Sequence, residues 1–465
     1  MNIDLSKITH IHFIGIGGIG ISAIARMMLH EGKTVSGQDM QDSEIIHVLK
    51  YAGAQITIGQ SFENIPKDAE LIVYTIAIEY YDPALFTALQ EGVVPIRSYP
   101  QMLTIVSDHK YTIAISGTHG KTTTTGMIAQ ILLDAGKDPT VIIGSLFQVI
   151  TKQMEENLNR VGTPGERVKR ANFAPSVGGR SNFIAGKSDY FVVEACEYRR
   201  SFLNINPNIL VITNIDADHL DYYKDITDIQ NAFRELALKV PSDGFVICDT
   251  HGEHIAQVIE GIPAQVINYQ TFFNSQLPLK IPGVHNKIDA AAAEAVAHTI
   301  GITKEVAENA LSQFPGTWRR FEYKGELPSG AKVYDDYAHH PVEIRATLQG
   351  FRELYPKEKG FSLTVIFQPH LFSRTKLLLA EFAESFADAD QVLILPIYYA
   401  REEDDGTISS EILASEINKH QANAEGFSDF ASVESIVDKT TFTDKDIIIT
   451  MGAGEANTIS DKLVK

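Results

Sequence analysis

The chain has 465 residues, of which 44% are hydrophobic and 21% charged, and its formal net charge at pH 7 is −19. This length predicts about three domains, and the composition is typical of a soluble globular protein. The negative charge argues against a nucleic-acid-binding protein, because a phosphate backbone would be repelled.

Targeting signals and cysteine usage indicate a cytoplasmic protein. The opening MNIDLSKITH has no basic segment followed by an apolar stretch, and no apolar run approaches the roughly 20 residues that a membrane span needs. Two cysteines, Cys196 and Cys248, are too few for a disulfide framework or a thiolate zinc site. We therefore expect a cytoplasmic protein with no membrane partner, and the oligomeric state stays open.

The first segment, residues 1–108, opens with a strand, a glycine-rich turn, a helix and a second strand that ends near Asp39. Gly15, Gly17 and Gly20 give the turn the G-x-G-x-x-G spacing that binds a pyrophosphate. An acid about 20 residues further on is typical of a ribose contact. Alone, this pattern favours an NAD-dependent dehydrogenase; the alternative is that the glycines serve only tight strand–helix packing.

The second segment, residues 109–314, contains ISGTHGKTTTT between an apolar strand and a helix. This context lets backbone N–H groups converge on phosphate oxygens at a helix N-terminus. Lys121 would supply positive charge and Thr122 an oxygen ligand for magnesium. Ile115 stands where the full Walker pattern needs a glycine, so only the shorter G-x-x-G-K-T remains. The alternative is a glycine-rich turn before an ordinary helix.

Two more apolar strands of this segment end in polar residues. DYFVVEACEYRRSF has Glu194 at its strand end. NILVITNIDADHLDYY has four polar residues after its strand: Asp216, Asp218, His219 and Asp221. Because ligands collect at the carboxyl ends of parallel strands, these groups should face the same crevice as Lys121. The irregular stretch around residues 147–178 reads as a long surface loop or lid, or equally as a disordered insertion.

The third segment, residues 315–465, repeats the strand–helix alternation. AKVYDDYAHHPVEIRATLQGF predicts a strand, a turn and a helix with Pro341 in its first turn. FSLTVIFQPHLFSRTKLLLAEFAESFADADQVLILPIY predicts a strand, a loop, an amphipathic helix and another strand. The fold class predicted for the whole chain is α/β, with three domains that each contain a mostly parallel sheet and flanking helices.

The combination of two nucleotide-type loops argues against a plain dehydrogenase. Hydride transfer needs neither a phosphate-loop lysine nor magnesium ligands. An NTP-driven reaction needs both, because the charge of the transferring phosphoryl group must be neutralised.

Eight motifs occur in the order expected of the Mur ligases: GIGGIGIS, GTHGKTTTT, EACEYRRSFL, TNIDADHLDYY, PGVHNKIDAAAA, RRFEYKG, YDDYAHHPVEI and FQPHLFSRT. The chain thus resembles this family over nearly its whole length. The resemblance implies a Rossmann-like first domain, a central domain similar to P-loop ATPases and a Rossmann-like third domain that binds the amino acid. The wording HFIGIGGIG is most similar to the alanine-adding member.

The implied activity is ATP-dependent joining of L-alanine to the lactyl carboxylate of UDP-N-acetylmuramate, through an acyl phosphate, with Mg²⁺ as cofactor. The substrates would be small molecules in peptidoglycan precursor synthesis. Two alternatives remain open. One is a ligase that adds a preformed tripeptide to the same sugar nucleotide, and the other is a nucleotide-binding regulator without turnover.

The resemblance also implies roles for individual residues. The ATP-binding residues would be Gly117, Thr118, His119, Gly120, Lys121, Thr122, Thr123, Asn286, Arg320 and Asp336. The UDP-sugar site would comprise Gly15, Gly17, Gly18 and Gly20, with Asp39 near the uridine. The magnesium ligands would be Thr122, Glu194 and His219. Direct catalytic roles would fall to Lys121, His219, His340 and Arg374, the last as the anchor for the alanine carboxylate.

Two residues depart from the family pattern. Leu371 replaces an arginine that is common after QPH, which increases the dependence on Arg374. Asp289 stands where asparagine is usual in the adenine-side motif.

Overall fold

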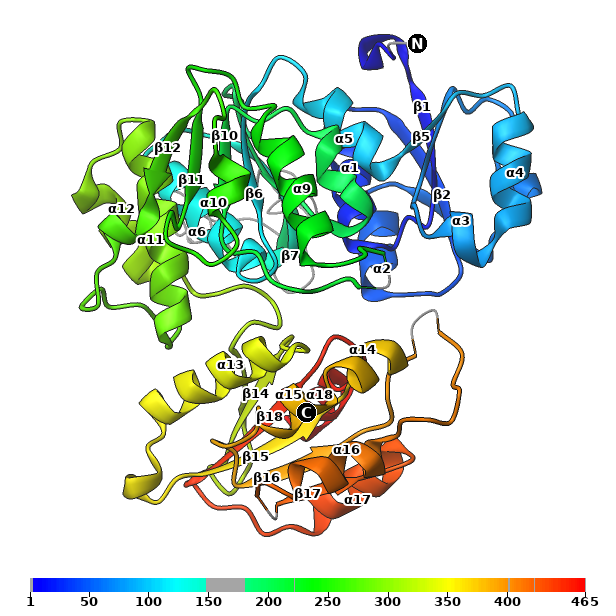
Figure 1. Cartoon of the computed structure of the whole chain (residues 1–465). Helices are drawn as coiled ribbons and strands as arrows, with labels where there is room; N and C mark the ends of the chain where they lie inside the picture. The colour runs from blue at the N-terminus through cyan, green and yellow to red at the C-terminus, as the bar shows by residue number, and fades with distance from the viewer. Residues whose placement is uncertain (1–2, 148–179, 221, 400–401, 422, 465) are drawn as a thin grey trace, which may run out of the picture. The chain divides into compact units, whose positions relative to one another are not determined.

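The computed structural model describes residues 3–147, 180–220, 222–399, 402–421 and 423–464. The stretch 148–179, on which the prediction of a loop or lid falls, lies outside these ranges. By their internal contacts the residues form two compact units, one of Met1–Leu277 with Ile288–Phe314 and one of Pro278–Lys287 with Pro315–Lys465. Figure 1 labels most of the helices and strands of both units.

The first sheet is parallel, with strand order β3-β2-β1-β4-β5. Its strands are β1 His10–Ile14, β2 Thr34–Asp39, β3 Gln55–Ile58, β4 Leu71–Tyr74 and β5 Ile96–Ser98. Its helices are α1 Ile19–His30, α2 Glu44–Tyr51, α3 Ile78–Tyr81, α4 Pro83–Glu91 and α5 Tyr99–Ser107. The order reverses between β1 and β4, so a ligand crevice is expected at the end of β1, where the glycine turn lies.

The second sheet has the order β12-β11-β10-β6-β9-β7-β8, parallel except for the β7–β8 pair. Its strands are β6 Tyr111–Ser116, β7 Thr140–Phe147, β8 Ser181–Ile184, β9 Tyr190–Glu194, β10 Ile209–Ile212, β11 Phe245–Cys248 and β12 Gln265–Asn268. Its helices are α6 Lys121–Asp134, α9 Ile226–Ala237, α10 Ala256–Ile259, α11 Val284–Thr299 and α12 Lys304–Gln313. Central strand β6 lies between β9 and β10, so the three polar strand ends predicted to share a crevice are neighbours.

The first and second sheets share one hydrophobic core. Helix α1 packs against β7 and β8, and the buried cluster includes residues of both sheets, such as Met28 and Phe183. The buried Asn182 in β8 donates a hydrogen bond to Ser22 Oγ at 2.9 Å and another to the backbone oxygen of Ile19, both in α1. The glycine turn that precedes α1 is thus held on the central sheet.

The second unit contains a six-stranded sheet of order β13-β14-β18-β15-β16-β17, in which only the β13–β14 pair is antiparallel. Its strands are β13 Glu322–Glu326, β14 Lys332–Asp336, β15 Ser362–Phe367, β16 Gln391–Ile394, β17 Ala424–Gly426 and β18 Asp446–Met451. Its helices are α13 Pro341–Leu354, α14 Phe372–Leu377, α15 Leu379–Ala383, α16 Ser410–Ile417, α17 Phe430–Lys439 and α18 Asn457–Leu463.

Two sequence-based expectations for this unit have different outcomes. Pro341 is in the first turn of α13, as predicted. The prediction of a single amphipathic helix after FQPHLF is wrong, because α14 and α15 are separate helices. Leu378 between them has φ −103° and ψ 24°, outside the helical range, and this interrupts the run of helical hydrogen bonds.

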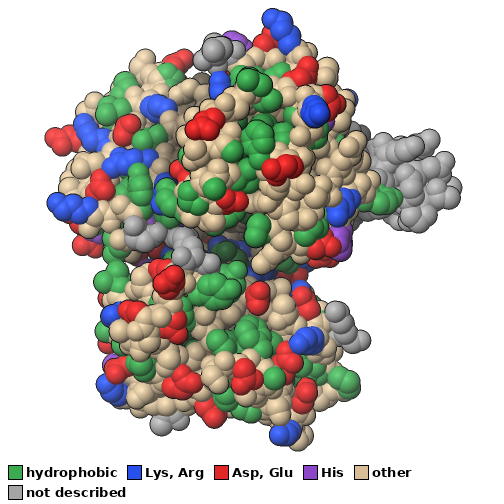
Figure 2. All heavy atoms as spheres, turned by 90° about the vertical axis from the view of Figure 1, so that its right-hand side faces the viewer, with side chains coloured by type: hydrophobic (Ala, Val, Ile, Leu, Met, Phe, Trp, Pro, Cys, Tyr) green, Lys and Arg blue, Asp and Glu red, His purple; other side chains and the backbone are tan. Residues whose placement is uncertain are grey.

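The surface and the helices add two observations. Figure 2 shows one face of the molecule, on which acidic and basic side chains are interspersed rather than gathered by sign. Within the described ranges, no helix combines the length and apolar character needed to cross a membrane.

Candidate functional site

The loop between β6 and α6 depends on two glycines with left-handed backbone. Gly117 has φ +137° and Gly120 has φ +79°, a region that L side chains rarely adopt. A Cβ on Gly117 would collide with the Thr213 side chain, and one on Gly120 with the carboxylate of Asp289. Asp289 therefore packs directly against this loop. Helix α6 begins at Lys121, so its first N–H groups face the loop.

Lys121 is held by the loop and by one acid. Its Nζ donates hydrogen bonds to the backbone oxygens of Gly117 at 2.6 Å and Thr118 at 3.0 Å. It also lies 3.0 Å from Glu197 Oε2 and 3.1 Å from Glu197 Oε1. Burial disfavours the charged lysine, but the acids around it, Glu197 first, outweigh that effect and raise the pKa of Lys121. The ammonium is therefore charged at neutral pH.

Glu197 is the site residue that our sequence reasoning missed. Its side chain is 3% exposed, and His219 Nε2 lies 3.4 Å from its Oε1. Burial would raise the pKa of Glu197, but Lys121 and the hydrogen bond from His219 prevail, so the pKa is lowered. A second acid three residues after Glu194, directly behind a buried strand, is the signal that could have identified it.

Thr122 and Glu194 meet, as the sequence predicted for neighbouring strand ends. Thr122 Oγ1 donates to Glu194 Oε1 at 3.0 Å, and the Gly144 N–H donates to Glu194 Oε2 at 2.8 Å. The third proposed metal ligand, His219, joins the cluster through Glu197. Two carboxylates, a hydroxyl and one imidazole form a donor set rich in oxygen, which fits Mg²⁺.

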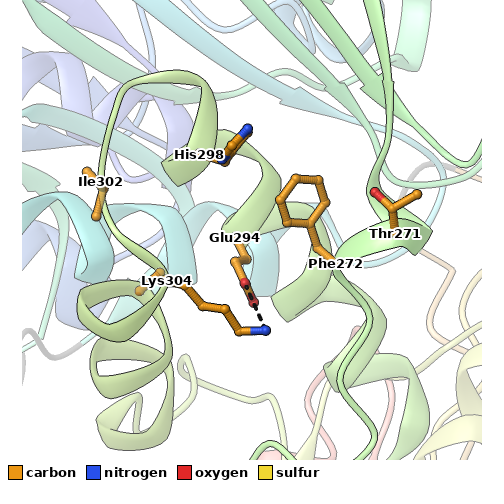
Figure 3. Close-up of a pocket in the computed structure, with 7 residues that line it drawn as sticks. Thr271, Phe272, Glu294, His298, Ile302 and Lys304 are labelled. Carbon is orange, nitrogen blue, oxygen red and sulfur yellow. Dashed lines mark ion pairs between the residues drawn. The ribbon is translucent and has the colours of Figure 1, made fainter.

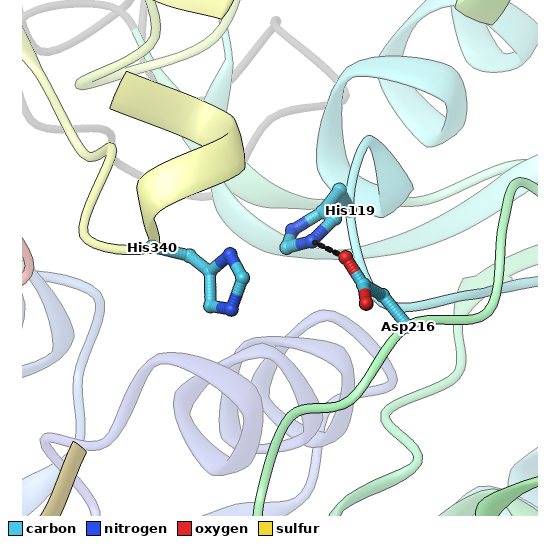
Figure 4. Close-up of side chains that lie close together, drawn as sticks. All are labelled: His119, Asp216 and His340. Carbon is cyan, nitrogen blue, oxygen red and sulfur yellow. Dashed lines mark ion pairs between the residues drawn. The ribbon is translucent and has the colours of Figure 1, made fainter. Parts of the chain in front are cut away.

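Other residues of the loop between β6 and α6 form hydrogen bonds with the chain that follows β10. The His119 N–H donates to Asn214 Oδ1 at 2.9 Å, and its ring Nε2 lies 3.5 Å from Asp216 Oδ2, the ion pair drawn in Figure 4. The Asp216 N–H donates to Thr118 Oγ1 at 2.8 Å. Thr123 is buried in the first turn of α6. These contacts connect the loop after β6 to the chain after β10.

The glycine turn after β1 is held by Asp39 itself. The Gly17 N–H donates to Asp39 Oδ2 at 2.8 Å, and the Gly15 N–H donates to the Gln38 backbone oxygen at 2.8 Å. Gly18 is the N-cap of α1, and a Cβ on Gly20 would lie 2.7 Å from the Tyr99 ring. The structure thus gives Asp39 a role in shaping the turn, and its proximity to uridine stays a prediction.

The second unit holds the other predicted site residues, three of them around its strand ends. Asp336 is buried, and its oxygens accept from the N–H groups of Phe321 at 2.7 Å and Ala338 at 2.8 Å. Arg320 Nη1 lies 3.8 Å from Glu343 Oε1. His340 caps α13 by accepting from a backbone N–H in its first turn.

Two further predicted residues are buried in this unit. Asn286 donates to the backbone oxygen of Pro282. Arg374, in α14, is 8% exposed and its Nη1 lies 3.3 Å from His370 Nδ1. This arginine therefore faces a protein interior rather than bulk water.

A separate cavity of about 260 Å³ lies beside α11 and α12 (Figure 3). Its lining residues are Thr271, Phe272, Glu294, His298, Ile302, Lys304 and Ala307. The ammonium of Lys304 is 3.9 Å from Glu294 Oε1. None of the predicted site residues lines this cavity.

These features define a class of α/β protein with three sheets. The second sheet carries a phosphate-type loop with a lysine beside clustered carboxylates. Three family models match the chain: the Mur ligase family catalytic domain over residues 10–111, the Mur ligase middle domain over 115–277, and the Mur ligase glutamate ligase domain over 319–454. The chain belongs to the Mur ligase family.

Individual relatives cover the chain almost completely. It is 38% identical to UDP-N-acetylmuramate–L-alanine ligase of Caldanaerobacter subterraneus subsp. tengcongensis, over 100% of this chain and 99% of the relative. The protein of the same name from Clostridium kluyveri is 37% identical over 98% of both chains. The crystal structure of UDP-N-acetylmuramate–alanine ligase from Thermotoga maritima superposes with a TM-score of 0.74, at 25% identity and 98% coverage of both chains.

Proposed function

We propose that this ligase joins L-alanine to the lactyl carboxylate of UDP-N-acetylmuramate, with cleavage of ATP to ADP and phosphate, as a cytoplasmic step of peptidoglycan precursor synthesis. The relatives that match the whole chain at 37–38% identity carry this activity in their names. The observation that supports the chemistry best is the cluster of Lys121 and His219 around the buried Glu197 carboxylate, beside the Thr122–Glu194 pair.

In the proposed first step, a lactyl carboxylate oxygen attacks the γ-phosphorus of ATP. The bond to the β,γ-bridging oxygen breaks, ADP leaves, and an acyl phosphate forms. The backbone N–H groups at the start of α6 and the Lys121 ammonium are suited to hold the β- and γ-phosphate oxygens. Two anions must approach each other here, so preorganised positive charge lowers the barrier.

The same cluster is suited to bind magnesium. Thr122, Glu194, Glu197 and His219 would hold Mg²⁺, which when bound neutralises phosphate charge and orients the transferring group. The lowered pKa of Glu197 keeps this carboxylate ionised at neutral pH, as a metal ligand must be.

In the second step, the amine of L-alanine attacks the acyl carbon, and the tetrahedral intermediate collapses to an amide and phosphate. The amine loses a proton, and phosphate is a far better leaving group than the oxide of a free carboxylate. For Arg374 we propose bidentate binding of the alanine carboxylate, for which a guanidinium is well shaped. His340 is proposed beside the amino acid, and Asn286, Arg320 and Asp336 on the ATP side.

A phosphate-release assay tests the proposal. Purified protein with ATP, Mg²⁺ and UDP-N-acetylmuramate is offered L-alanine, L-serine, glycine or the tripeptide in separate reactions. Release with L-alanine, together with the matching mass of the product, is the expected result. Release only with the tripeptide would instead assign the recycling reaction, and no release with any acceptor would favour a nucleotide-binding regulator.

A further inference from the structure

The guanidinium of Arg199 lies among three tyrosine rings, one from helix α3 and two from the segments that follow β9 and β10. Its Cζ is 3.6 Å from the ring centroid of Tyr80, 5.5 Å from that of Tyr198 and 5.7 Å from that of Tyr222. Across the ranges that the structure describes, none of its recorded contacts is with a carboxylate or carbonyl oxygen. A guanidinium stacked in this way keeps its N–H edge available for an anion.

The position of Arg199 connects the two phosphate-type loops of the first unit. On one side, Tyr80 is in α3, and the residue after it, Tyr81, lies beside the glycine turn. A Cβ on Gly15 would be 3.8 Å from Tyr81 Oη. On the other side, Tyr198 packs on the His219 ring with 4.8 Å between centroids. Arg199 therefore lies between the candidate UDP-sugar turn and the candidate site of phosphoryl transfer.

The backbone at Arg199 and Arg200 is strained, and this conformation directs the Arg199 side chain toward the tyrosine rings. Arg199 has φ 53° and ψ 31°, and Arg200 has φ 56° and ψ 24°. Left-handed backbone is unfavourable for two consecutive non-glycine residues, and such strain is typical of functional sites. Arg200 is neutralised by Asp228 at 2.6 Å and Glu235 at 3.5 Å. The salt bridges of Arg200 hold the turn, whereas no carboxylate among the described residues forms a recorded ion pair with Arg199.

We propose that Arg199 binds an oxyanion of the UDP-sugar substrate and so aligns this substrate between the glycine turn and Lys121. The inference rests on the proposed function for the identity of the substrate. A guanidinium recognises a carboxylate and a phosphate with the same two-pronged geometry. The oxyanion is therefore either the lactyl carboxylate or the diphosphate, and the ligands chosen for the test separate these two sources.

Calorimetric titration without ATP tests the proposal in the full-length protein. The ligands are UDP, UDP-N-acetylglucosamine, which lacks the lactyl group, and UDP-N-acetylmuramate. The variant Arg199→Gly removes the guanidinium and suits the left-handed backbone, and Arg199→Lys keeps a cation. If the lactyl carboxylate is bound, Arg199→Gly weakens only UDP-N-acetylmuramate, by roughly ten- to a hundredfold. If the diphosphate is bound, all three ligands weaken alike. In both cases Arg199→Lys recovers part of the loss.

Tyr80→Leu is the matched control, because it removes the stacking ring and leaves Arg199 in place. The proposal predicts that this change costs clearly less affinity than Arg199→Gly. Unchanged affinities in Arg199→Gly would overturn the proposal. It would also be overturned if Tyr80→Leu reproduced the whole loss, since the contact would then only join the sheets. These measurements report binding and do not require turnover. A negative result in the phosphate-release assay would therefore reject the proposed function, whereas only the binding data decide the role of Arg199.

Discussion

Glu197 lies between Lys121 and His219, with its Oε2 3.0 Å from the lysine ammonium and its Oε1 3.4 Å from the imidazole. The carboxylate is buried, so its charge depends on these two neighbours. A change at any one of the three groups should therefore alter the other two. Because of this coupling, single and double variants of these residues should affect activity and stability differently.

Replacing Lys121 with methionine should abolish phosphate release and also destabilise the protein. The remaining Glu197 carboxylate would be a buried charge without its principal partner, which costs about 3 kcal/mol of unfolding free energy. The double variant Lys121→Met/Glu197→Gln should regain most of this stability and none of the activity. Urea unfolding and the phosphate assay measure the two effects. A double variant no more stable than the single one would contradict the coupling.

Glu197→Gln should raise the Mg²⁺ concentration needed for half-maximal activity by roughly tenfold or more, because a neutral amide is a poorer ligand than a carboxylate. Glu194→Gln should act in the same direction. Activity measured across a magnesium titration reports the shift. The exposed Glu411, in α16, supplies the control variant Glu411→Gln, whose magnesium curve should match that of the unaltered protein.

Gly117→Ala should abolish ATP binding, because its Cβ would collide with Thr213 and push the phosphate loop out of shape. Gly32→Ala is the matched comparison, since Gly32 has φ +80° and open space around it. That change should cost about 1–2 kcal/mol of stability through backbone strain alone. Nucleotide titration should find normal affinity in Gly32→Ala. Retained ATP binding in Gly117→Ala would contradict the proposed cradle.

Stability should fall in acid because of His12. Burial, together with repulsion from His10, lowers the pKa of His12 to about 4, whereas an unfolded histidine titrates near 6.5. Between these two values the unfolded chain binds a proton that the native state excludes. The unfolding free energy should therefore decrease as pH falls from about 6.5 to 4, by up to about 3 kcal/mol.

The variant His12→Asn checks this pH dependence. Asparagine can keep a hydrogen bond like the one between His12 Nδ1 and Ser36 Oγ, which is 2.8 Å long, and does not titrate. Its unfolding free energy should vary less over this pH range than that of the unaltered protein. His47, whose side chain is 64% exposed, provides the control His47→Asn, which should leave the slope unchanged.

Much of the fold was predictable because local signals agree with the tertiary structure. The spacing of the glycines at 15–20 and of Gly120–Thr122, each between a buried strand and a helix, placed both turns correctly at the ends of β1 and β6. The meeting of Thr122 and Glu194 followed from the rule that parallel strand ends share an edge. The antiparallel strands β8 and β13 were not predicted. Strand β8 is only four residues long, and β13 reads EYKGE, which lacks the apolar pattern of a strand.

The same signals mark Glu197 as a second candidate acid but do not show that it, rather than Glu194, contacts Lys121. In EACE the first acid ends the buried strand β9 and the second lies three residues further on, and only the course of the chain after β9 decides which one contacts Lys121. That course depends on left-handed backbone at Arg199 and Arg200, where no glycine or asparagine announces it. Long-range packing of Tyr198 on His219 and of Arg199 on Tyr80 holds the turn, and such contacts cannot be read from residue order.

The hydrogen bonds from Asn182 to Ser22 and Ile19 affect how this chain could be recombined with its relatives. They belong to an apolar contact that α1 makes with β7 and β8. A fragment cut near residue 108 would expose that surface of α1 to water and favour aggregation. A chimera that exchanges the amino-terminal portion should therefore keep its glycine turn in shape only when the graft includes the matching face of β7 and β8.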